Sequence, residues 1–388
     1  MAAVAFALIG CDQGSQKDEP QGSGLPVVPV KLVGANIGPN QPLPANASIE
    51  LAFDRLLSPL SITRQTFVLE DIGMTTGFTP TVSYDPVSRI VTITPLTDVG
   101  QTLTPQQSYK LVITTPKDAT DVNGLRAIDG APLESPGTQT IAFTAAAPTA
   151  SPTATVSIDF CRDIHPIFQA NCAMVAACHI EPSKSTPSNA AGLVLDPPSF
   201  IPSTAIGRVS QGANTGPFAR AAAPSLLFGE DMPIVDPNGN ASNSWLLYKI
   251  LLAVPSPPPA PVVEAGAEAG ETGEAGVEAG SGVMDAGTGE AGASGEAGAS
   301  DAGGTDGGAD AGDGGVAKAV PVIVPPVDVS HAHALPWSAD SDADRALLSN
   351  YILGREMPYP PFAPLTLDEL ERLSLWIAQG ASTPSTCQ

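Results

Sequence analysis

The chain has 388 residues, a formal net charge of −23, and 38 glycines and 40 prolines. So many residues that favour turns argue against an all-helical protein. The acidic balance argues against nucleic acid as a partner, because phosphate binding needs clustered lysine and arginine. The length predicts two or three folded units. No run of 18 apolar residues occurs beyond the first ten positions, so no membrane-spanning helix is expected.

The first 24 residues resemble the signal and tether of a bacterial lipoprotein. The apolar opening MAAVAFALIG leads into Leu8-Ile9-Gly10-Cys11, which is similar to a lipobox. The resemblance implies that Cys11 carries lipid and anchors the chain to a membrane of the cell envelope, facing the periplasm or the cell surface. The next stretch, DQGSQKDEPQGSG, has nothing to bury and is predicted to be a polar tether. The alternative is an apolar stub with a chance cysteine.

Residues 25–146 show the pattern of a β-sandwich. Residues 48–53 alternate apolar and polar side chains, as a half-buried strand does. Residues 81–84 and 90–94 flank Asp85-Pro86-Val87-Ser88, which predicts a hairpin. Further strands are expected over 109–113 and 140–144, with a turn at Asn123-Gly124. Several short strands at this spacing are typical of a sandwich.

These strands, with Asp121-Val122-Asn123-Gly124 and the closing Phe143-Thr144, resemble the SbsA-type bacterial Ig-like domain of cell-surface proteins. The resemblance covers about 120 residues and implies a spacer or adhesion module. The sequence has no His and no Cys between Cys11 and Cys161, so no catalytic constellation is expected in this region.

Two segments of biased composition divide the rest of the chain. Residues 147–156 lie in a Pro/Ala/Thr-rich linker. Residues 255–330 begin PSPPPAPVV and continue with Glu-Ala-Gly and Asp-Ala-Gly units that lack an apolar period. We expect this acidic insertion to be disordered. Between Glu264 and Asp313 it carries 12 of the 40 acidic residues, and without these 12 the net charge would be −11.

The chemistry-bearing residues lie just after the linker. Cys172 and Cys178 are separated by five residues, and His179 follows the second cysteine directly. In c-type cytochromes two cysteines bind haem covalently and the adjacent histidine binds the iron, usually with the spacing C-x-x-C-H. The wider spacing here departs from that pattern and puts the double attachment in doubt.

The surrounding motifs resemble cytochrome-c-like domains of exported bacterial proteins, over residues 157–254 and 331–388. In order, these motifs are Asp163 to Phe168, Asn171-Cys172, Cys178-His179, Gly192 to Leu195, Ser244 to Lys249, Met357-Pro358 and Leu373 to Ala381. The resemblance implies a mainly α-helical domain that binds haem c. Cys172 and Cys178 would form the thioethers, His179 would be the proximal ligand and Met357 the distal one. Such ligation suits one-electron transfer with a redox partner protein and no enzymatic activity.

Each candidate ligand has an alternative. Met357 could be ordinary core filler, and Met232 precedes a proline as Met357 does and is a rival distal ligand. We interpret His165 as a surface or capping histidine. His331 and His333 have i,i+2 spacing, do not share a helix face, and are expected in a loop, although ligation by one of them stays open.

The remaining cysteines have structural alternatives. A disulfide between Cys161 and Cys387 would tie the start of this domain to its end. Cys172 and Cys178 could also form a disulfide with each other, which would give a haem-free domain. A zinc site built from Cys161, Cys172, Cys178 and His179 is a further alternative, although exported proteins favour disulfides.

A C-terminal helix is predicted independently of any resemblance. Thr366 and Glu369 fit a capping box, and Gly380 is a natural stop. Leu370, Leu373, Trp376 and Ile377 fall on one face.

The sequence therefore predicts a multidomain chain: an all-β Ig-like sandwich and a mainly α cytochrome-c-like domain with a disordered acidic insertion. The function expected is haem-mediated electron transfer by a membrane-anchored lipoprotein. The alternative is a non-catalytic surface or adhesion lipoprotein whose second domain is stapled by disulfides and lacks haem.

Overall fold

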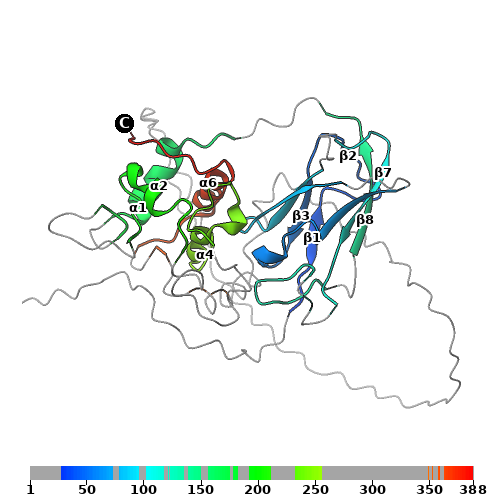
Figure 1. Ribbon diagram of the computed structural model, residues 1–388, viewed down its shortest axis with the longest axis horizontal. Helices are drawn as coiled ribbons and strands as arrows, with labels where there is room; N and C mark the ends of the chain where they lie inside the picture. The colour runs from blue at the N-terminus through cyan, green and yellow to red at the C-terminus, as the bar shows by residue number, and fades with distance from the viewer. Residues whose placement is uncertain are drawn as a thin grey trace, which may run out of the picture. The chain divides into compact units, whose positions relative to one another are not determined.

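The computed structural model describes two folded parts of the chain (Figure 1). The described residues are 28–72, 78–95, 102–117, 121, 123–134, 139–149, 156–174, 178–181, 192–210, 232–255, 348, 352, 357–358 and 362–387. All of these described residues lie in one compact unit. The expectations for residues 1–24 with Cys11, for the insertion after Pro255, and for His331 and His333 lie outside the described residues.

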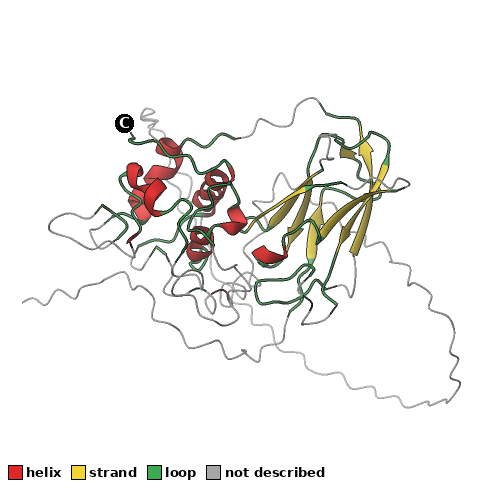
Figure 2. Cartoon of the chain, in the orientation of Figure 1, coloured by secondary structure: helices red, strands yellow, loops and turns green. Residues whose placement is uncertain are grey.

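The N-terminal part is a sandwich of two four-stranded sheets (Figure 2). One sheet has the order β1-β3-β6-β5 and the other β2-β8-β7-β4. The strands are β1 Leu32–Ala35, β2 Leu43–Pro44, β3 Ile49–Phe53, β4 Phe67–Asp71, β5 Thr81–Asp85, β6 Ile90–Thr94, β7 Ser108–Ile113 and β8 Gln139–Ala146. All pairings are antiparallel except that between β2 and β8.

The predicted strands and hairpin are confirmed, because side-chain alternation fixes which face of each strand is buried. In β7, Tyr109, Leu111 and Ile113 point into the core, and the residues between them are half-buried. Strands β5 and β6 form the predicted hairpin, with Thr81 opposite Thr94. The Asp85 side chain accepts hydrogen bonds from the Val87 amide and the Ser88 hydroxyl, which stabilises the turn.

Three strands, β1, β2 and β4, were not predicted. Strand β2 has two residues and is too short to show a period. Strand β4 ends in Glu70 and Asp71, which are poor strand formers, but it pairs with β7 along its whole length. Lys110 and Glu70 face each other across this pair and form an ion pair of 2.6 Å. Tertiary pairing therefore overrides the weak local preference of β4.

The C-terminal part is helical. It is distinct from the short 3-10 turn η1 Pro59–Ser61, which lies in the sandwich. The helical part contains η2 Phe160–Ile164, which is a π-turn, α1 His165–Asn171, η4 Pro198–Phe200, α2 Ile201–Thr204, η6 Ala241–Asn243, α4 Trp245–Ile250 and α6 Leu367–Ala378. Among the described residues, none of the helices has the length and apolar character needed to cross a bilayer.

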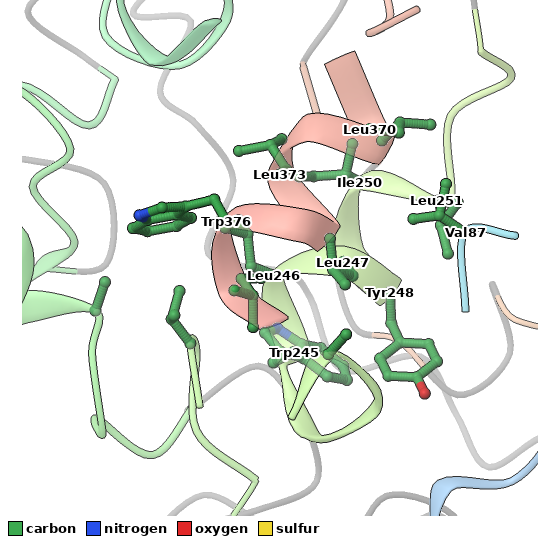
Figure 3. Packing of buried hydrophobic residues seen from close by; sticks show 14 of the residues in the cluster. Val87, Trp245, Leu246, Leu247, Tyr248, Ile250, Leu251, Leu370, Leu373 and Trp376 are labelled. Carbon is green, nitrogen blue, oxygen red and sulfur yellow. The ribbon is translucent and has the colours of Figure 1, made fainter. Parts of the chain in front are cut away.

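Helix α6 forms as the sequence predicts. The Thr366 hydroxyl accepts from the Glu369 amide at 3.2 Å, and the Glu369 carboxylate accepts from the Thr366 amide at 2.7 Å, so the capping box is complete. The apolar face is buried: Leu370 and Leu373 lie beside α4 (Figure 3), and Trp376 packs on Phe160 and Phe168. Gly380 ends the helix with φ +90°.

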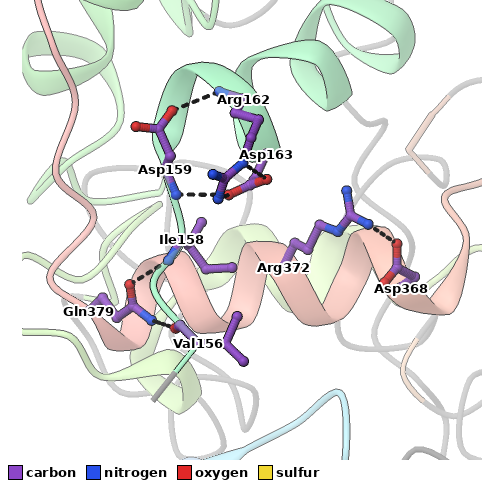
Figure 4. A network of polar contacts seen from close by, with 8 residues as sticks. All are labelled: Val156, Ile158, Asp159, Arg162, Asp163, Asp368, Arg372 and Gln379. Carbon is purple, nitrogen blue, oxygen red and sulfur yellow. Dashed lines mark hydrogen bonds and ion pairs between the residues drawn. The ribbon is translucent and has the colours of Figure 1, made fainter. Parts of the chain in front are cut away.

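Polar contacts tie the beginning of the helical part to the end of α6 (Figure 4). The Gln379 side chain donates to the Val156 carbonyl at 2.7 Å and accepts from the Ile158 amide at 3.1 Å. Beside it, Asp159 caps η2 by accepting from the Arg162 amide. The Arg162 guanidinium bonds the Asp163 carboxylate and lowers its pKa to about 2.

The predicted disulfide between Cys161 and Cys387 is confirmed and closes the helical part at the same end. Its Cα atoms are 5.3 Å apart, which is ordinary disulfide spacing. The first and last described segments of the helical part are therefore held together by a covalent bond as well as by hydrogen bonds.

Residues from the sandwich contribute to the hydrophobic cluster of the helical part. Leu56, Val87 and Ile128 belong to the cluster that contains α4 and α6. The Ser374 hydroxyl of α6 donates to the Asp85 carboxylate at 2.7 Å. Both parts lie in the same compact unit. The apolar contacts between them contribute to the stability of both.

Candidate functional site

The two ends of the C-x5-C-H loop meet through the backbone. Helix α1 ends at Asn171, and Cys172 follows as its C-cap. The His179 amide donates to the Cys172 carbonyl at 3.0 Å. Although five residues separate Cys172 from Cys178 in sequence, this hydrogen bond closes the loop. It places the first cysteine beside the backbone of the histidine.

The His179 imidazole is oriented by the segment 193–195. Its Nδ1 atom lies 3.2 Å from the Leu193 carbonyl oxygen, and the Leu195 amide donates to the His179 carbonyl at 2.7 Å. A carbonyl can only accept a hydrogen bond, so Nδ1 must carry the proton. In the neutral imidazole the lone pair then resides on Nε2. This tautomer, set by a backbone carbonyl, is the one in which histidine commonly binds a metal through Nε2.

Cys172 and Cys178 are both thiols, since neither forms a disulfide. Burial, together with the smaller effects of the Cys178 and Glu369 charges, raises the pKa of the Cys172 thiol to about 12. A thiol with such a pKa is neutral at physiological pH and is a poor nucleophile on its own.

The two methionine candidates lie in different surroundings. Met232 is 1% exposed and belongs to the hydrophobic cluster of the helical part. Met357 is half-buried and precedes the buried Pro358 through a cis peptide bond. Met232 is therefore packed in the core of the helical part, whereas Met357 is partly accessible.

Two expectations are corrected. His165 is not on the surface: it is 9% exposed, and its Nε2 atom lies 2.8 Å from an Asp196 carboxylate oxygen. It does cap a helix, but through its backbone, because the His165 amide bonds the Phe160 carbonyl as the C-cap of η2. The zinc alternative is wrong, because the Cys161 sulfur is bonded to Cys387. Within the described residues, no group of three or more His, Cys, Asp or Glu side chains could hold a metal ion.

Asp196 is the residue near this site that sequence reasoning missed. It stands 17 positions after His179, in a Leu-Asp-Pro-Pro segment with no metal-ligand spacing. The one available signal is a single acidic residue that ends the Gly-Leu-Val-Leu run. Its histidine partner lies 31 residues earlier, so no local pattern connects them.

The donor set fits a covalently held haem in two respects. The two thiols are not in a disulfide, and the imidazole next to the second one has its Nδ1 proton bound to a backbone carbonyl. Cys172 and Cys178 would hold the group and His179 would ligate its iron through Nε2. Such a group supplies a one-electron redox couple.

Comparison with known proteins identifies the sandwich. Residues 28–145 match the family model described as a bacterial Ig-like domain. Among solved structures, the S-layer protein rSbsC(31-844) is 18% identical, with a TM-score of 0.24, over 34% of this chain and 16% of that chain. The N-terminal part of the S-layer protein SbsC is likewise 18% identical, with a TM-score of 0.23, over 34% of this chain and 27% of that chain.

Among curated proteins, none matches the chain. The family match covers all eight strands apart from the last residue of β8. It agrees with the two-sheet topology and with the paired hairpin strands. Residues 28–145 of this chain are therefore a bacterial Ig-like domain.

Proposed function

We propose that this protein is an exported lipoprotein whose Ig-like domain carries a cytochrome-c-like domain that transfers electrons through covalently bound haem. The observation that carries the proposal is the Nδ1 atom of His179, 3.2 Å from the Leu193 carbonyl, in a residue directly after Cys178. This contact orders the imidazole for Nε2 ligation before any iron is bound. No substrate chemistry is proposed for either domain.

Each residue has a role that follows from its chemistry. Cys172 and Cys178 provide sulfur for thioether bonds, and the hydrogen bond from His179 to the Cys172 carbonyl keeps both ends of the loop together. Met357 would provide a thioether sulfur as a second protein ligand to the iron. Histidine and methionine ligation raises the potential of a haem and suits electron transfer with a partner protein.

The proposed location is the cell surface or periplasm, with Cys11 as the lipid anchor. The disulfide between Cys161 and Cys387 supports export, because disulfides persist in oxidising compartments. A bacterial Ig-like domain supports a role at the cell surface. A lipid-modified N-terminal peptide, detected by mass spectrometry of protein from membranes, would support the anchor, and an unmodified Cys11 would contradict it.

The decisive experiment is to express the full chain with a cytochrome maturation system and record its absorption spectrum. We expect a Soret band that remains with the protein after acid-acetone extraction, and that is lost in the double variant Cys172→Ala/Cys178→Ala. Met357→Leu should alter the spectrum of the reduced protein. Met232→Leu is the matched control, because it removes the rival sulfur from the core and should leave the spectrum unchanged.

A second function is favoured by the Ig-like domain itself: a non-catalytic surface or adhesion lipoprotein without haem. The wide spacing between Cys172 and Cys178 favours it, and the disulfide between Cys161 and Cys387 would stabilise the helical part without a cofactor. Protein from the maturation host that shows no Soret band would support this function and contradict the first.

A further inference from the structure

A short extended segment, residues 193–196, holds the His179 region by three contacts. The Leu193 carbonyl oxygen accepts a hydrogen bond from His179 Nδ1, with 3.2 Å between the two atoms. The His179 carbonyl receives the Leu195 amide at 2.7 Å. The Glu181 amide donates to the Asp196 carbonyl at 2.9 Å. The orientation of the imidazole therefore depends on where this segment lies.

The segment is itself anchored at two points. The Thr204 hydroxyl of α2 donates to the Val194 carbonyl at 2.9 Å. At the other point, the Asp196 carboxylate lies 2.8 Å from Nε2 of His165. His165 is the first residue of α1, the helix that leads directly into Cys172. The second anchor thus connects the segment that orients His179 to the helix that carries the first cysteine.

The His165 ring is held firmly enough to act as an anchor. It is 9% exposed and stacks on Phe160, with ring centroids 6.0 Å apart and an interplanar angle of 27°. Phe160 packs in turn on Trp376 of α6, at 5.7 Å between centroids. A hydrogen bond that joins a carboxylate to a ring fixed in this way is directional and resists displacement.

We propose that the contact between His165 and Asp196 positions His179 relative to Cys172. The inference rests on the proposed function, in which these two residues attach and ligate a haem. His165 and Asp196 are positioning residues, since they act through the segment 193–196. Loss of the contact would leave a part-buried carboxylate without its partner and would loosen this segment.

The first test measures amide hydrogen exchange in the full-length protein without haem. In His165→Leu, we expect the Glu181 and Leu195 amides to exchange about tenfold faster, because a lost hydrogen bond to a charged group weakens local structure. The Leu370 amide in α6, which bonds the Thr366 carbonyl, should keep its protection. His165→Gln should restore slow exchange, because its side-chain amide can donate to Asp196.

Gln379→Ala is the matched control. It removes two side-chain hydrogen bonds from the helical part without touching the segment 193–196. It should leave exchange at Glu181 and Leu195 unchanged. If His165→Leu accelerates all amides of the helical part equally, or none, the contact is merely structural and the proposal is overturned. Should that variant fail to fold, Asp196→Ala replaces it with the same expected local result.

The second test uses protein from the maturation host. We expect the fraction of chains with covalent haem to fall several-fold in His165→Leu and to be retained in His165→Gln and Gln379→Ala. Wild-type protein without haem would overturn the proposed function, whereas the exchange result would still decide the positioning role. Equal loading of wild type and His165→Leu would contradict the positioning role alone.

Discussion

At Gly124 the backbone adopts a conformation that side chains rarely allow, with φ +93°. A Cβ atom there would lie 2.5 Å from the Pro116 nitrogen and 2.6 Å from the Thr115 carbonyl carbon. Both neighbours are backbone atoms and cannot rotate away. The Leu125 amide next to it donates to the Thr114 carbonyl, so the two segments approach closely at this point.

Gly124→Ala should destabilise the sandwich by about 3 kcal/mol, because the clash adds to the cost of the left-handed backbone. Gly130→Ala is the matched control: φ is +86°, but its Cβ would meet nothing within 4 Å, so it should cost about 1 kcal/mol. Guanidinium unfolding of the full chain, followed by the far-ultraviolet signal of the strands, measures the difference. Equal losses in the two variants would contradict the close approach.

Single residues also show where sequence reasoning succeeds and where it stops. The bend at Gly124 was predictable, because an Asn-Gly pair readily adopts a positive φ, and Gly124 has φ +93°. The pairing of His165 with Asp196 was not, since a contact across 31 residues depends on how α1 and the segment 193–196 come together. The Cys178-His179 dipeptide is visible in the sequence, but the hydrogen bond of His179 to the Leu193 carbonyl depends on the fold.

Among the elements, α6 was predicted with its cap, buried face and stop. All of these signals lie within 15 residues and follow from helix geometry alone. Strand β4 was missed for the opposite reason, because its stability comes from pairing with β7, about 40 residues away. Helices α1, α2 and α4 are short, between four and seven residues, so their local helix propensities say little about where they form.

The capping box of α6 provides a test at this scale. Thr366→Ala removes the acceptor for the Glu369 amide and should cost about 1 kcal/mol in the free energy of unfolding. Thr366→Ser keeps the hydroxyl and should cost less than half as much. Tryptophan fluorescence, to which the buried Trp245 and Trp376 both contribute, reports unfolding of the helical part. If alanine and serine destabilise equally, the hydroxyl is not the stabilising group.

Across the whole molecule, the acidic residues are unevenly distributed, and the disulfide encloses only the C-terminal part of the chain. Most of the acidic excess falls in the insertion, so the folded parts are less acidic than the total of −23 indicates. The disulfide between Cys161 and Cys387 spans 226 positions and encloses the helical part together with the insertion. The Ig-like domain, residues 28–145, lies wholly outside this loop.

This arrangement predicts that the two parts respond differently to loss of the disulfide. In the chain-entropy account, closing so long a loop stabilises by about 5 kcal/mol. In Cys161→Ala/Cys387→Ala, that stabilisation should be lost from the helical part, while the sandwich strands lie outside the loop. We therefore expect amide exchange at Leu370 to accelerate by at least about a hundredfold, even if part of the entropic gain is absent.

Exchange at the Leu111 amide, which lies in the central strand β7, should change by less than about threefold, a residual effect of the contacts that Leu56, Val87 and Ile128 make with the helical cluster. A comparable acceleration at both amides would mean that the sandwich depends on the helical part for its own stability. Unchanged exchange at Leu370 would mean that hydrogen bonds such as those of Gln379 suffice to hold the ends together. Adding Gln379→Ala to the cysteine variant separates these causes, because it removes the two side-chain hydrogen bonds between residues 156–158 and the end of α6.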